Sequence, residues 1–251
     1  MFIPYKLKYF LRCLANSEDR NAAIAFLFNG ELTIGFVDRL RFILRIYRIS
    51  LNTTIAHTEA EILAVATAVL SAPREIPGCL VEAGCFKGGS TAKFSLVAKL
   101  SGRKLYAFDS FEGLPDNDEQ HGKTISGDGT HFVKGNYLGT LEEVQATIRK
   151  WGDINSTECI KGWFDNTMPT FKKQIVAAYV DLDLVSSTKT CLKYLFPLLQ
   201  PGSILFSQDG HLPLIIECLQ DRKTWEDDVG VAPPMMEGLG SKKLVRISRP
   251  T

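Results

Sequence analysis

The sequence lacks several features that would assign it to a specialised class of protein. No run in its 251 residues approaches the ~20 apolar residues that span a bilayer. With 29 basic and 28 acidic side chains the net charge is only +1, so neither nucleic acid nor an anionic membrane is a predicted partner. No internal repeat and no low-complexity linker interrupts the chain. The 45% hydrophobic and 23% charged residues are ordinary for a globular fold.

The cysteines also lack the spacing of a metal site or a disulfide framework. None of them forms a C-x-x-C pair, and several lie within apolar runs that predict strands or helices. This pattern predicts free thiols in a reducing cytoplasm. The six positions are Cys13, Cys79, Cys85, Cys159, Cys191 and Cys218.

The amino-terminal segment lacks the continuous apolar core and small-residue cleavage site of a secretory signal. We expect residues 5–15 to form a helix that packs on a partner subunit. A helix lying in a membrane interface is the alternative.

The remaining sequence divides into a helical part and an alternating part. Residues 1–75 carry helical apolar periodicity without clear strands and predict an amino-terminal helical extension. Its clearest helix covers residues 58–70, with Thr58 as cap, Glu61 at capping-box distance and Pro73 beyond the end. Residues 76–251 alternate predicted strands with helical patterns.

This alternation predicts an α/β fold with a Rossmann-like, doubly wound and mostly parallel sheet. Residues 243–248 would add a late, antiparallel edge strand. The parallel strands are expected at residues 79–84, 104–109, 158–163, 176–181 and 203–207.

The most informative motif covers residues 80–90. It has the pattern of a strand, a glycine turn and a helix start, with the spacing E-x-G-x-x-x-G-G from Glu82 onward. Gly84 and Gly88 permit tight or positive-φ backbone, and we expect Ser90 and Thr91 to cap the helix that follows. The next strand ends at Asp109, whose carboxylate can accept hydrogen bonds from two ribose hydroxyls.

This spacing favours one adenosine-containing cofactor. A dinucleotide site uses G-x-G-x-x-G, because a pyrophosphate needs backbone N–H groups and a helix N-terminus. Glu82 would repel a pyrophosphate but suits a ligand with an ammonium and a sulfonium group. The motif therefore predicts S-adenosylmethionine, and a plain strand-to-helix connection is the alternative.

A second group of polar residues follows two later strands. Asp181 ends one strand, and Gln208, Asp209 and His211 end the next. Because the carboxyl ends of neighbouring parallel strands face one crevice, Asp181, Gln208 and Asp209 predict a Mg²⁺ site. Such an ion would lower the pKa of a substrate hydroxyl and hold it in line with the sulfonium methyl. In the alternative interpretation Asp183 caps the next helix and His211 bonds locally.

One long segment, residues 112–137, has five glycines and no sustained periodicity. Loops of this length in a compact domain are often lids or binding loops. We expect a substrate-facing lid, with a mobile surface loop as the alternative.

Four strings of this sequence resemble the macrocin O-methyltransferase (TylF/MycF-type) family. They are the E-x-G-x-x-x-G-G-S turn, D-S-F-E-G-L-P from Asp109, K-G-W-F-D-N-T-M-P from Lys161 and V-D-L-D-L-x-x-S-T from Val180. The resemblance covers roughly residues 55–220. It implies S-adenosylmethionine-dependent and Mg²⁺-dependent methylation of a hydroxyl, in characterised members on a macrolide sugar.

The resemblance also implies residue roles. The family's motif would place the methionine end of the cofactor near Glu82, Gly84 and Ser90, with Gly88 in the same turn. Asp109 and Ser110 would meet the ribose. Asp181 would be a metal ligand and general base, with Asp209 a further ligand. The adenine region would be formed by Gly162, Trp163 and Phe164.

Two departures from the family pattern affect these expectations. Gln208-Asp209 stands where the family has paired aspartates, which predicts weaker or absent Mg²⁺ binding and leaves His211 as an alternative base. The family has an acid just before the threonine of the G-W-F string, whereas this chain has Asn166 there and Asp165 one position earlier.

The sequence therefore predicts a cytoplasmic, homodimeric O-methyltransferase acting on a small hydroxylated acceptor, most simply a sugar or polyol of a specialised metabolite or glycan. The helical extension would build the dimer contact or cover the acceptor. Two other functions stay open. A nucleotide-sugar glycosyltransferase would use Asp181 and Asp183 as its metal site, and a non-catalytic homologue would bind the cofactor without turnover.

Overall fold

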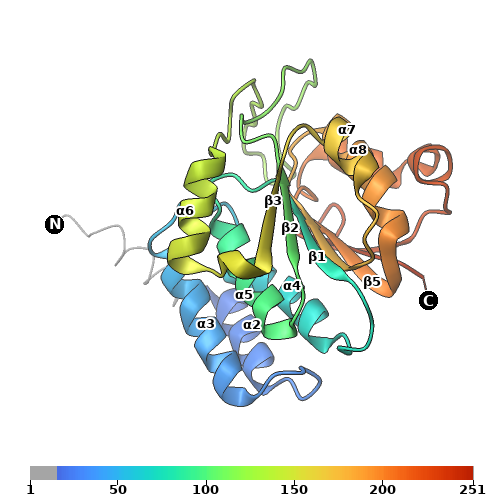
Figure 1. The fold of residues 1–251 in the computed structure, drawn as a ribbon. Coiled ribbons are helices and arrows are strands. Elements are labelled where there is room, and N and C mark those ends of the chain that lie inside the picture. Colours follow the sequence, from blue (N-terminus) through green and yellow to red (C-terminus); the bar gives the residue numbers. More distant parts are fainter. Residues whose placement is uncertain (1–15, 251) are drawn as a thin grey trace.

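The computed structural model describes residues 16–250 of the chain. Figure 1 shows a central sheet with helices on both faces. Seven strands follow the order β3-β2-β1-β4-β5-β7-β6. The predicted helix at residues 5–15 lies outside the described residues.

The strands agree closely with the sequence prediction. Five of them pair in parallel, and the order reverses direction between β1 and β4, as in a doubly wound sheet. β7 pairs antiparallel with β5, as predicted, but it is not the edge, because the unpredicted β6 pairs with its other side. The bounds are β1 Cys79–Ala83, β2 Leu105–Asp109, β3 Thr157–Lys161, β4 Ile175–Val180, β5 Leu199–Ser207, β6 Met235–Glu237 and β7 Val245–Ser248.

The helices form two layers around this sheet (Figure 1). The extension contributes α2 Ser17–Phe28, α3 Phe36–Ser50 and α4 Glu59–Ser71. The alternating part contributes α5 Gly89–Ser101, α6 Leu141–Trp151, α7 Phe164–Thr167, α8 Val185–Leu195 and α9 Pro213–Gln220. Short 3₁₀ turns are η1 Ile154–Ser156, η2 Met168–Thr170 and η3 Phe196–Leu198, and η4 Thr224–Val229 is a π-helical turn.

The two helices whose starts were predicted begin differently. α4 has the predicted capping box, in which Thr58 accepts from the Glu61 N–H and Glu61 accepts from the Thr58 N–H. The prediction for α5 was wrong: Gly88 occupies the cap position at φ 77°, without a side-chain cap bond. Ser90 and Thr91 lie inside the first turn, where both are buried. A glycine with positive φ therefore starts this helix, because the chain must turn sharply out of β1.

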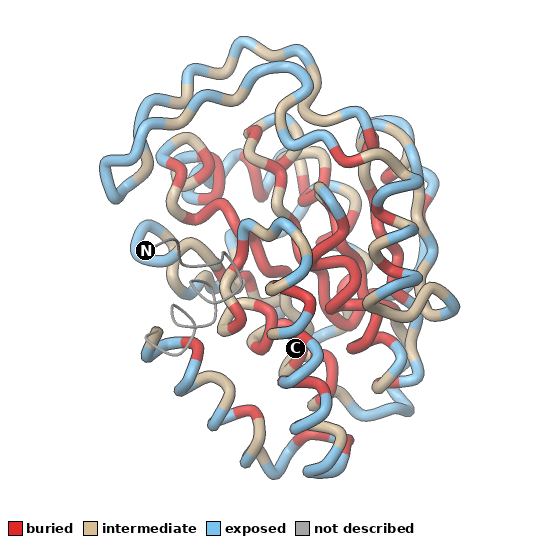
Figure 2. Tube along the Cα trace, turned by 90° about the vertical axis from the view of Figure 1, so that its left-hand side faces the viewer, coloured by how far each residue is buried: buried red, intermediate tan, exposed pale blue. Residues whose placement is uncertain are grey.

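The extension packs directly onto the sheet. One hydrophobic cluster joins α2, α3, α4 and α5 to one face, and a second joins α8, α9 and η4 to the other. Figure 2 shows these buried segments at the centre and mostly exposed chain in the long loop. The five described cysteines are free thiols. Within residues 16–250, no helix is both long and apolar enough to cross a bilayer.

A buried ion pair ties the extension to α5. Lys93 Nζ lies 2.8 Å from Glu59 Oε2, and both side chains are fully buried. Ser50 Oγ and His57 Nε2 lie 2.6 and 3.0 Å from the same nitrogen. Burial, followed by the neighbouring Lys93 ammonium, holds the pKa of His57 well below its usual range, so the neutral ring accepts from Lys93. The ammonium is thus compensated by groups from α3, α4 and the turn before α4.

Removing one partner of this pair leaves an uncompensated buried charge. We expect Lys93→Met to lower the free energy of unfolding by about 3–5 kcal/mol. The double variant Lys93→Met with Glu59→Met should lose clearly less, because no charge is then stranded. Urea titrations of the three proteins measure this difference.

The exposed pair Arg222–Glu226, with side chains 75% and 42% exposed, is the matched control. Glu226→Gln should cost less than about 1 kcal/mol. A double variant as unstable as Lys93→Met would contradict the stranded-charge explanation.

Candidate active site

A cavity of about 610 Å³ opens at the carboxyl ends of the central strands. The segments after β1, β2, β3, β4 and β5 line it, and the one after β2 is the long loop that leads to α6. Ala56 of the extension and Lys243 before β7 complete the wall. In a doubly wound sheet, this edge beside the reversal in strand order is where ligands bind.

The predicted glycine turn forms one side of this cavity. Gly84 lines it with φ 90°, and a Cβ at this position would lie 2.0 Å from the carbonyl oxygen of Asp181. Only glycine fits so close to the end of β4. The turn after β1 and the acids after β4 therefore face the same space.

Asp109 also lines the cavity, and its carboxylate has a structural task there. Its two oxygens each accept a backbone N–H at 2.7 Å, one from Cys85 and one from Phe111. Burial raises the pKa of Asp109, and these bonds oppose the shift. The carboxylate thus ties the turn after β1 to the turn after β2 while it faces the cavity.

Glu82, which the sequence placed at the cofactor, lies behind the cavity and not in its lining. It is fully buried in β1, and neither carboxylate oxygen has a hydrogen-bond partner among the described residues. Burial raises the pKa of Glu82 to about 8, and the nearby Ser90 and Thr91 hydroxyls oppose this rise. Two buried acceptors without donors are a feature that a cationic ligand group would satisfy.

The remaining predicted cofactor residues divide between the cavity lining and its support. Ser110, Trp163 and Phe164 line the cavity, and Trp163 is 37% exposed. The N–H of Gly162 donates to the Asp109 carbonyl at 3.0 Å, which sets the start of the Trp163 turn beside β2. Glu82, Gly88, Ser90 and Gly162 are not among the lining residues.

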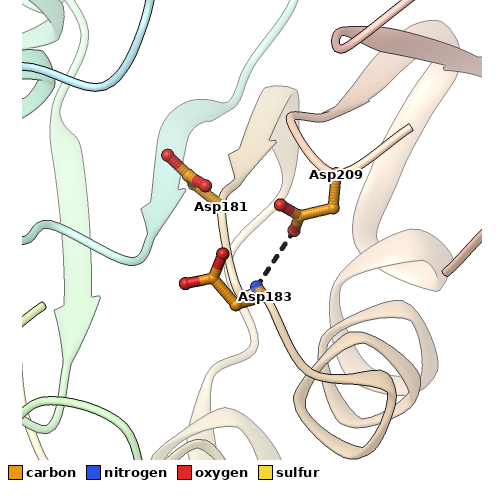
Figure 3. A group of neighbouring side chains, drawn as sticks. All are labelled: Asp181, Asp183 and Asp209. Atoms are coloured by element: carbon orange, nitrogen blue, oxygen red, sulfur yellow. Dashed lines mark hydrogen bonds between the residues drawn. The ribbon is translucent and has the colours of Figure 1, made fainter. Parts of the chain in front are cut away.

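Three carboxylates meet at the ends of β4 and β5. Asp181, Asp183 and Asp209 each offer an oxygen within 4.8 Å of the others, and all three line the cavity (Figure 3). One Asp209 oxygen accepts the N–H groups of Leu182 and Asp183 at 2.9 and 3.2 Å. The two strands are 26 or more positions apart in sequence at this point, so parallel pairing of β4 with β5 creates the group.

Burial and mutual repulsion disfavour the simultaneous ionisation of these acids. Desolvation, then the Asp209 charge, raises the pKa of Asp181 to about 7 and that of Asp183 to about 9. Burial also raises the pKa of Asp209. Lys243, which lines the cavity and donates to the Ala56 carbonyl at 2.8 Å, opposes all three shifts. Full ionisation of the three acids would therefore leave more negative charge than the nearby cation balances.

The donor set fits a hard divalent cation. Carboxylate oxygens are the ligands that Mg²⁺ and Ca²⁺ prefer. Asp209 Oδ1 is buried and has no partner among the described residues, so it is available to a cation. The sequence prediction for a methyltransferase did not include Asp183 among the metal ligands.

The local backbone explains why Asp183 joins this group. Its φ is 63°, a conformation that aspartate adopts more readily than most residues. The alternative interpretation, in which Asp183 caps the following helix, does not hold, because Leu184 is the cap residue of α8 and makes no side-chain cap bond. The side chain that caps α8 is instead Glu119 of the long loop, which accepts the N–H groups of Val185 and Ser186 at 2.7 and 2.9 Å.

Gln208 and His211 fit their predicted roles less well than Asp181 and Asp209 do. Gln208 is fully buried, does not line the cavity, and donates from Nε2 to Glu61 Oε2 at 2.9 Å. His211 lines the cavity, but burial, then the Lys243 charge, lowers its pKa to about 4. A base with this pKa is poorly matched to proton removal near neutral pH, which weakens the sequence argument for His211.

The long loop faces the cavity as predicted. Gly113, Thr130, Phe132 and Tyr137 are among its lining residues. Apart from one bridge between Lys123 and Gly129, it has no regular structure, and in Figure 1 it rises above the sheet. The Glu119 contact with α8 holds its middle beside the acids. Closure of this loop as a lid stays a prediction.

With this geometry established, similarity to known proteins identifies the family. A model of the macrocin O-methyltransferase (TylF) family matches residues 55–237, which is most of the chain. The chain belongs to this family. The match begins in the turn before α4 and ends in β6, so it includes every element that lines the cavity except the β7 hairpin with Lys243.

Among characterised relatives, a tetracenomycin rhamnosyl 4'-O-methyltransferase from Streptomyces olivaceus is 28% identical over 167 residues, which are 64% of this chain. The chain spans 63% of the length of that relative. Among solved structures, the O-methyltransferase NovP superposes with a TM-score of 0.67 and 21% identity, covering 85% of this chain and all of NovP. The calicheamicin methyltransferase CalS11 gives a TM-score of 0.57 and 18% identity over 93% of each chain. These two structures support the Rossmann-like methyltransferase fold.

The raised pKa values make a prediction about stability. Because Asp181 and Asp183 bind protons more tightly in the folded state, their contribution to stability falls as pH rises from about 4 through about 9. His211, with a lowered pKa, acts in the opposite direction only below about 6.5. In EDTA, Asp183→Asn should therefore raise the melting temperature at pH 8, by roughly 2–4 °C per kcal/mol relieved.

Melting curves of the two proteins at pH 5 and pH 8 test this expectation. The difference should shrink at pH 5, where the wild-type carboxyls are protonated. A variant that is no more stable than wild type at pH 8 would show that the acids do not repel one another in the folded protein.

Proposed function

We propose that this protein is an S-adenosylmethionine-dependent O-methyltransferase that methylates a sugar hydroxyl of a glycosylated metabolite or glycan, assisted by Mg²⁺. One observation carries the proposal: the glycine turn with Asp109 and the acid group around Asp181 line a single cavity. Membership of the macrocin O-methyltransferase family supports the same reaction class.

The residues present fit the cofactor. The nucleoside would be held by Asp109, Ser110, Trp163 and Phe164. Because Gly84 has no side chain, the cofactor could lie close to the backbone there. The buried, unpartnered carboxylate of Glu82 would compensate positive charge at the methionine end, through the first turn of α5 or directly. When bound, S-adenosylmethionine supplies an electrophilic methyl group, whose transfer to oxygen breaks the sulfur–methyl bond and leaves S-adenosylhomocysteine.

The acid group has two tasks in this proposal. Asp181 and Asp209 would hold Mg²⁺, with Gln208 as a neutral oxygen ligand, and the ion supplies the charge that favours a deprotonated hydroxyl. The hydroxyl proton must reach a nearby base, for which the cavity offers Asp181, Asp183 and His211. We favour the two aspartates, because the lowered pKa of His211, about 4, makes it a weak acceptor.

The acceptor side of the cavity suits a ring with hydroxyl groups. Phe86 and Tyr137 meet edge to face with centroids 5.9 Å apart, and both line the cavity. Aromatic faces beside carboxylates are compatible with a sugar. The rhamnosyl acceptor in the name of the Streptomyces olivaceus relative also supports a sugar. Ala56 of the extension lines the cavity, which supports the extension as a cover for this acceptor.

The family match argues against a glycosyltransferase but not against a non-catalytic homologue. Family membership favours methyl transfer over glycosyl transfer, and it accounts for the glycine turn that a D-x-D metal site leaves unexplained. A non-catalytic cofactor-binding homologue would share both family and fold, so only measurement separates it from an enzyme.

We also propose a homodimer. Exposed apolar side chains on α2 and α3 support it, including Phe28 at 70%, Val37 at 56% and Leu44 at 62% exposure. Light scattering should give twice the chain mass of 27.9 kDa, and Leu44→Glu should shift it toward the monomer. A monomeric wild type at micromolar concentration would remove this proposal without affecting the reaction.

Calorimetric titration with S-adenosylhomocysteine tests the proposed function. We expect binding at micromolar or tighter affinity. Asp109→Ala should weaken it at least about tenfold, because the variant removes two loop-fixing bonds and the candidate ribose acceptor. The absence of binding by the wild-type protein would exclude the proposed cofactor.

Methyl transfer to hydroxylated glycosides, followed by mass spectrometry, tests turnover. Asp181→Asn should reduce the rate at least about a hundredfold while S-adenosylhomocysteine affinity stays within about threefold. Full activity of this variant would show that Asp181 is neither ligand nor base. Tight cofactor binding without transfer to any acceptor would favour the non-catalytic homologue.

A further inference from the structure

Two buried oxygen atoms lie on consecutive residues at the end of β5. Gln208 Oε1 and Asp209 Oδ1 are both inaccessible, and neither has a hydrogen-bond partner among the described residues. A buried acceptor without a donor is costly, and two on adjacent residues are unusual. Because β5 ends at Ser207 and the chain then turns, the two side chains are not forced to opposite faces of the sheet.

Gln208 lies beside the acid group. Its N–H donates to the Val180 carbonyl at 2.9 Å, immediately before Asp181, and Asp209 is its neighbour in the chain. The register of β4 and β5 also pairs Val180 with Ser207, so the residues that follow leave the sheet side by side. The backbone of Gln208 thus lies beside two members of the group formed by Asp181, Asp183 and Asp209.

Glu61 determines which end of this amide is available. Glu61 Oε2 accepts the Gln208 NH₂ group at 2.9 Å and the Thr58 N–H at 2.7 Å. A carboxylate can only accept, so the amide nitrogen must face Glu61 and the carbonyl oxygen must face away. The same contact brings the charge of Glu61 near Asp181, whose pKa it helps to raise.

We propose that Glu61 is a positioning residue that fixes the Gln208 amide with its carbonyl oxygen as a neutral ligand in the divalent-cation site of Asp181 and Asp209. The proposal rests on the proposed function, since it concerns the same cation. It assigns the capping-box residue of α4 a second role, through which the helical extension is coupled to the catalytic edge of the sheet. A ligand-orienting partner of this kind commonly changes metal affinity by about 10–100-fold.

The chain offers a matched control for this role. Thr58 and Glu61 form the two halves of one capping box, so Thr58→Ala and Glu61→Ala both remove a cap bond from α4. Either loss should lower the melting temperature to a similar degree. Only Glu61→Ala also releases the Gln208 amide.

Titration of Mg²⁺ alone into the metal-free, full-length protein measures the effect without any methyl transfer. We expect Glu61→Ala to weaken Mg²⁺ binding about tenfold or more and Thr58→Ala to leave it within about twofold. Glu61→Gln, which keeps the size of the side chain, should also weaken binding, because its NH₂ group can turn the Gln208 amide around. This variant keeps the test valid if Glu61→Ala folds poorly.

A double-mutant cycle then shows whether Glu61 acts through Gln208. Gln208→Met should weaken Mg²⁺ binding as Glu61→Ala does, and adding Glu61→Ala to it should cause little further loss. Three results would overturn the inference: Gln208→Met with wild-type affinity, equal losses in Thr58→Ala and Glu61→Ala, or a wild-type protein that binds no Mg²⁺. A titration with S-adenosylhomocysteine in EDTA separates these from failure of the proposed function, because Glu61 does not line the cavity that would hold the cofactor.

Discussion

The crowding of Asp181, Asp183 and Asp209 at one edge of the sheet is the constraint on which the site depends. Three carboxyl groups within 4.8 Å, facing one lysine, would carry more negative charge when fully ionised than their surroundings compensate. The pKa of Asp183, raised to about 9 chiefly by burial, expresses this cost. A fold retains such a cost where a cation or a proton transfer relieves it, which is why this edge, and not the opposite one, is the catalytic candidate.

The surrounding structure holds these acids in place by backbone contacts. Asp209 accepts two N–H groups of the turn that contains Asp183, and Glu119 caps α8 directly after it. Gly84 permits the turn after β1 to approach the Asp181 carbonyl. The cofactor side and the acid side are therefore parts of one rigid arrangement, in which Asp109 and Asp209 play corresponding roles as carboxylates that join two loops.

The helical extension contributes more than a cover. Lys93 of α5 is neutralised by Glu59 of α4, and Gln208 beside the acid group is held by Glu61 of the same helix. These contacts join residues 34 and 147 positions apart, respectively, and their α4 residues lie two positions apart on the first turn of that helix. The placement of this single turn therefore affects both the buried core and the candidate cation site.

The sequence by itself determined the order of elements, because apolar periodicity, the Thr58–Glu61 capping box and the glycine turn are local signals. It also placed Asp181 and Asp209 together, since parallel strands end at a common edge. It missed β6, whose three residues carry almost no pattern, and it misassigned the cap of α5. Only the tertiary structure decided that Asp183 lines the cavity with Asp181 and Asp209, that Glu119 accepts the first N–H groups of α8, and that Glu61 accepts from Gln208. These contacts depend on loop conformation and on packing between distant segments, which no spacing in the sequence encodes.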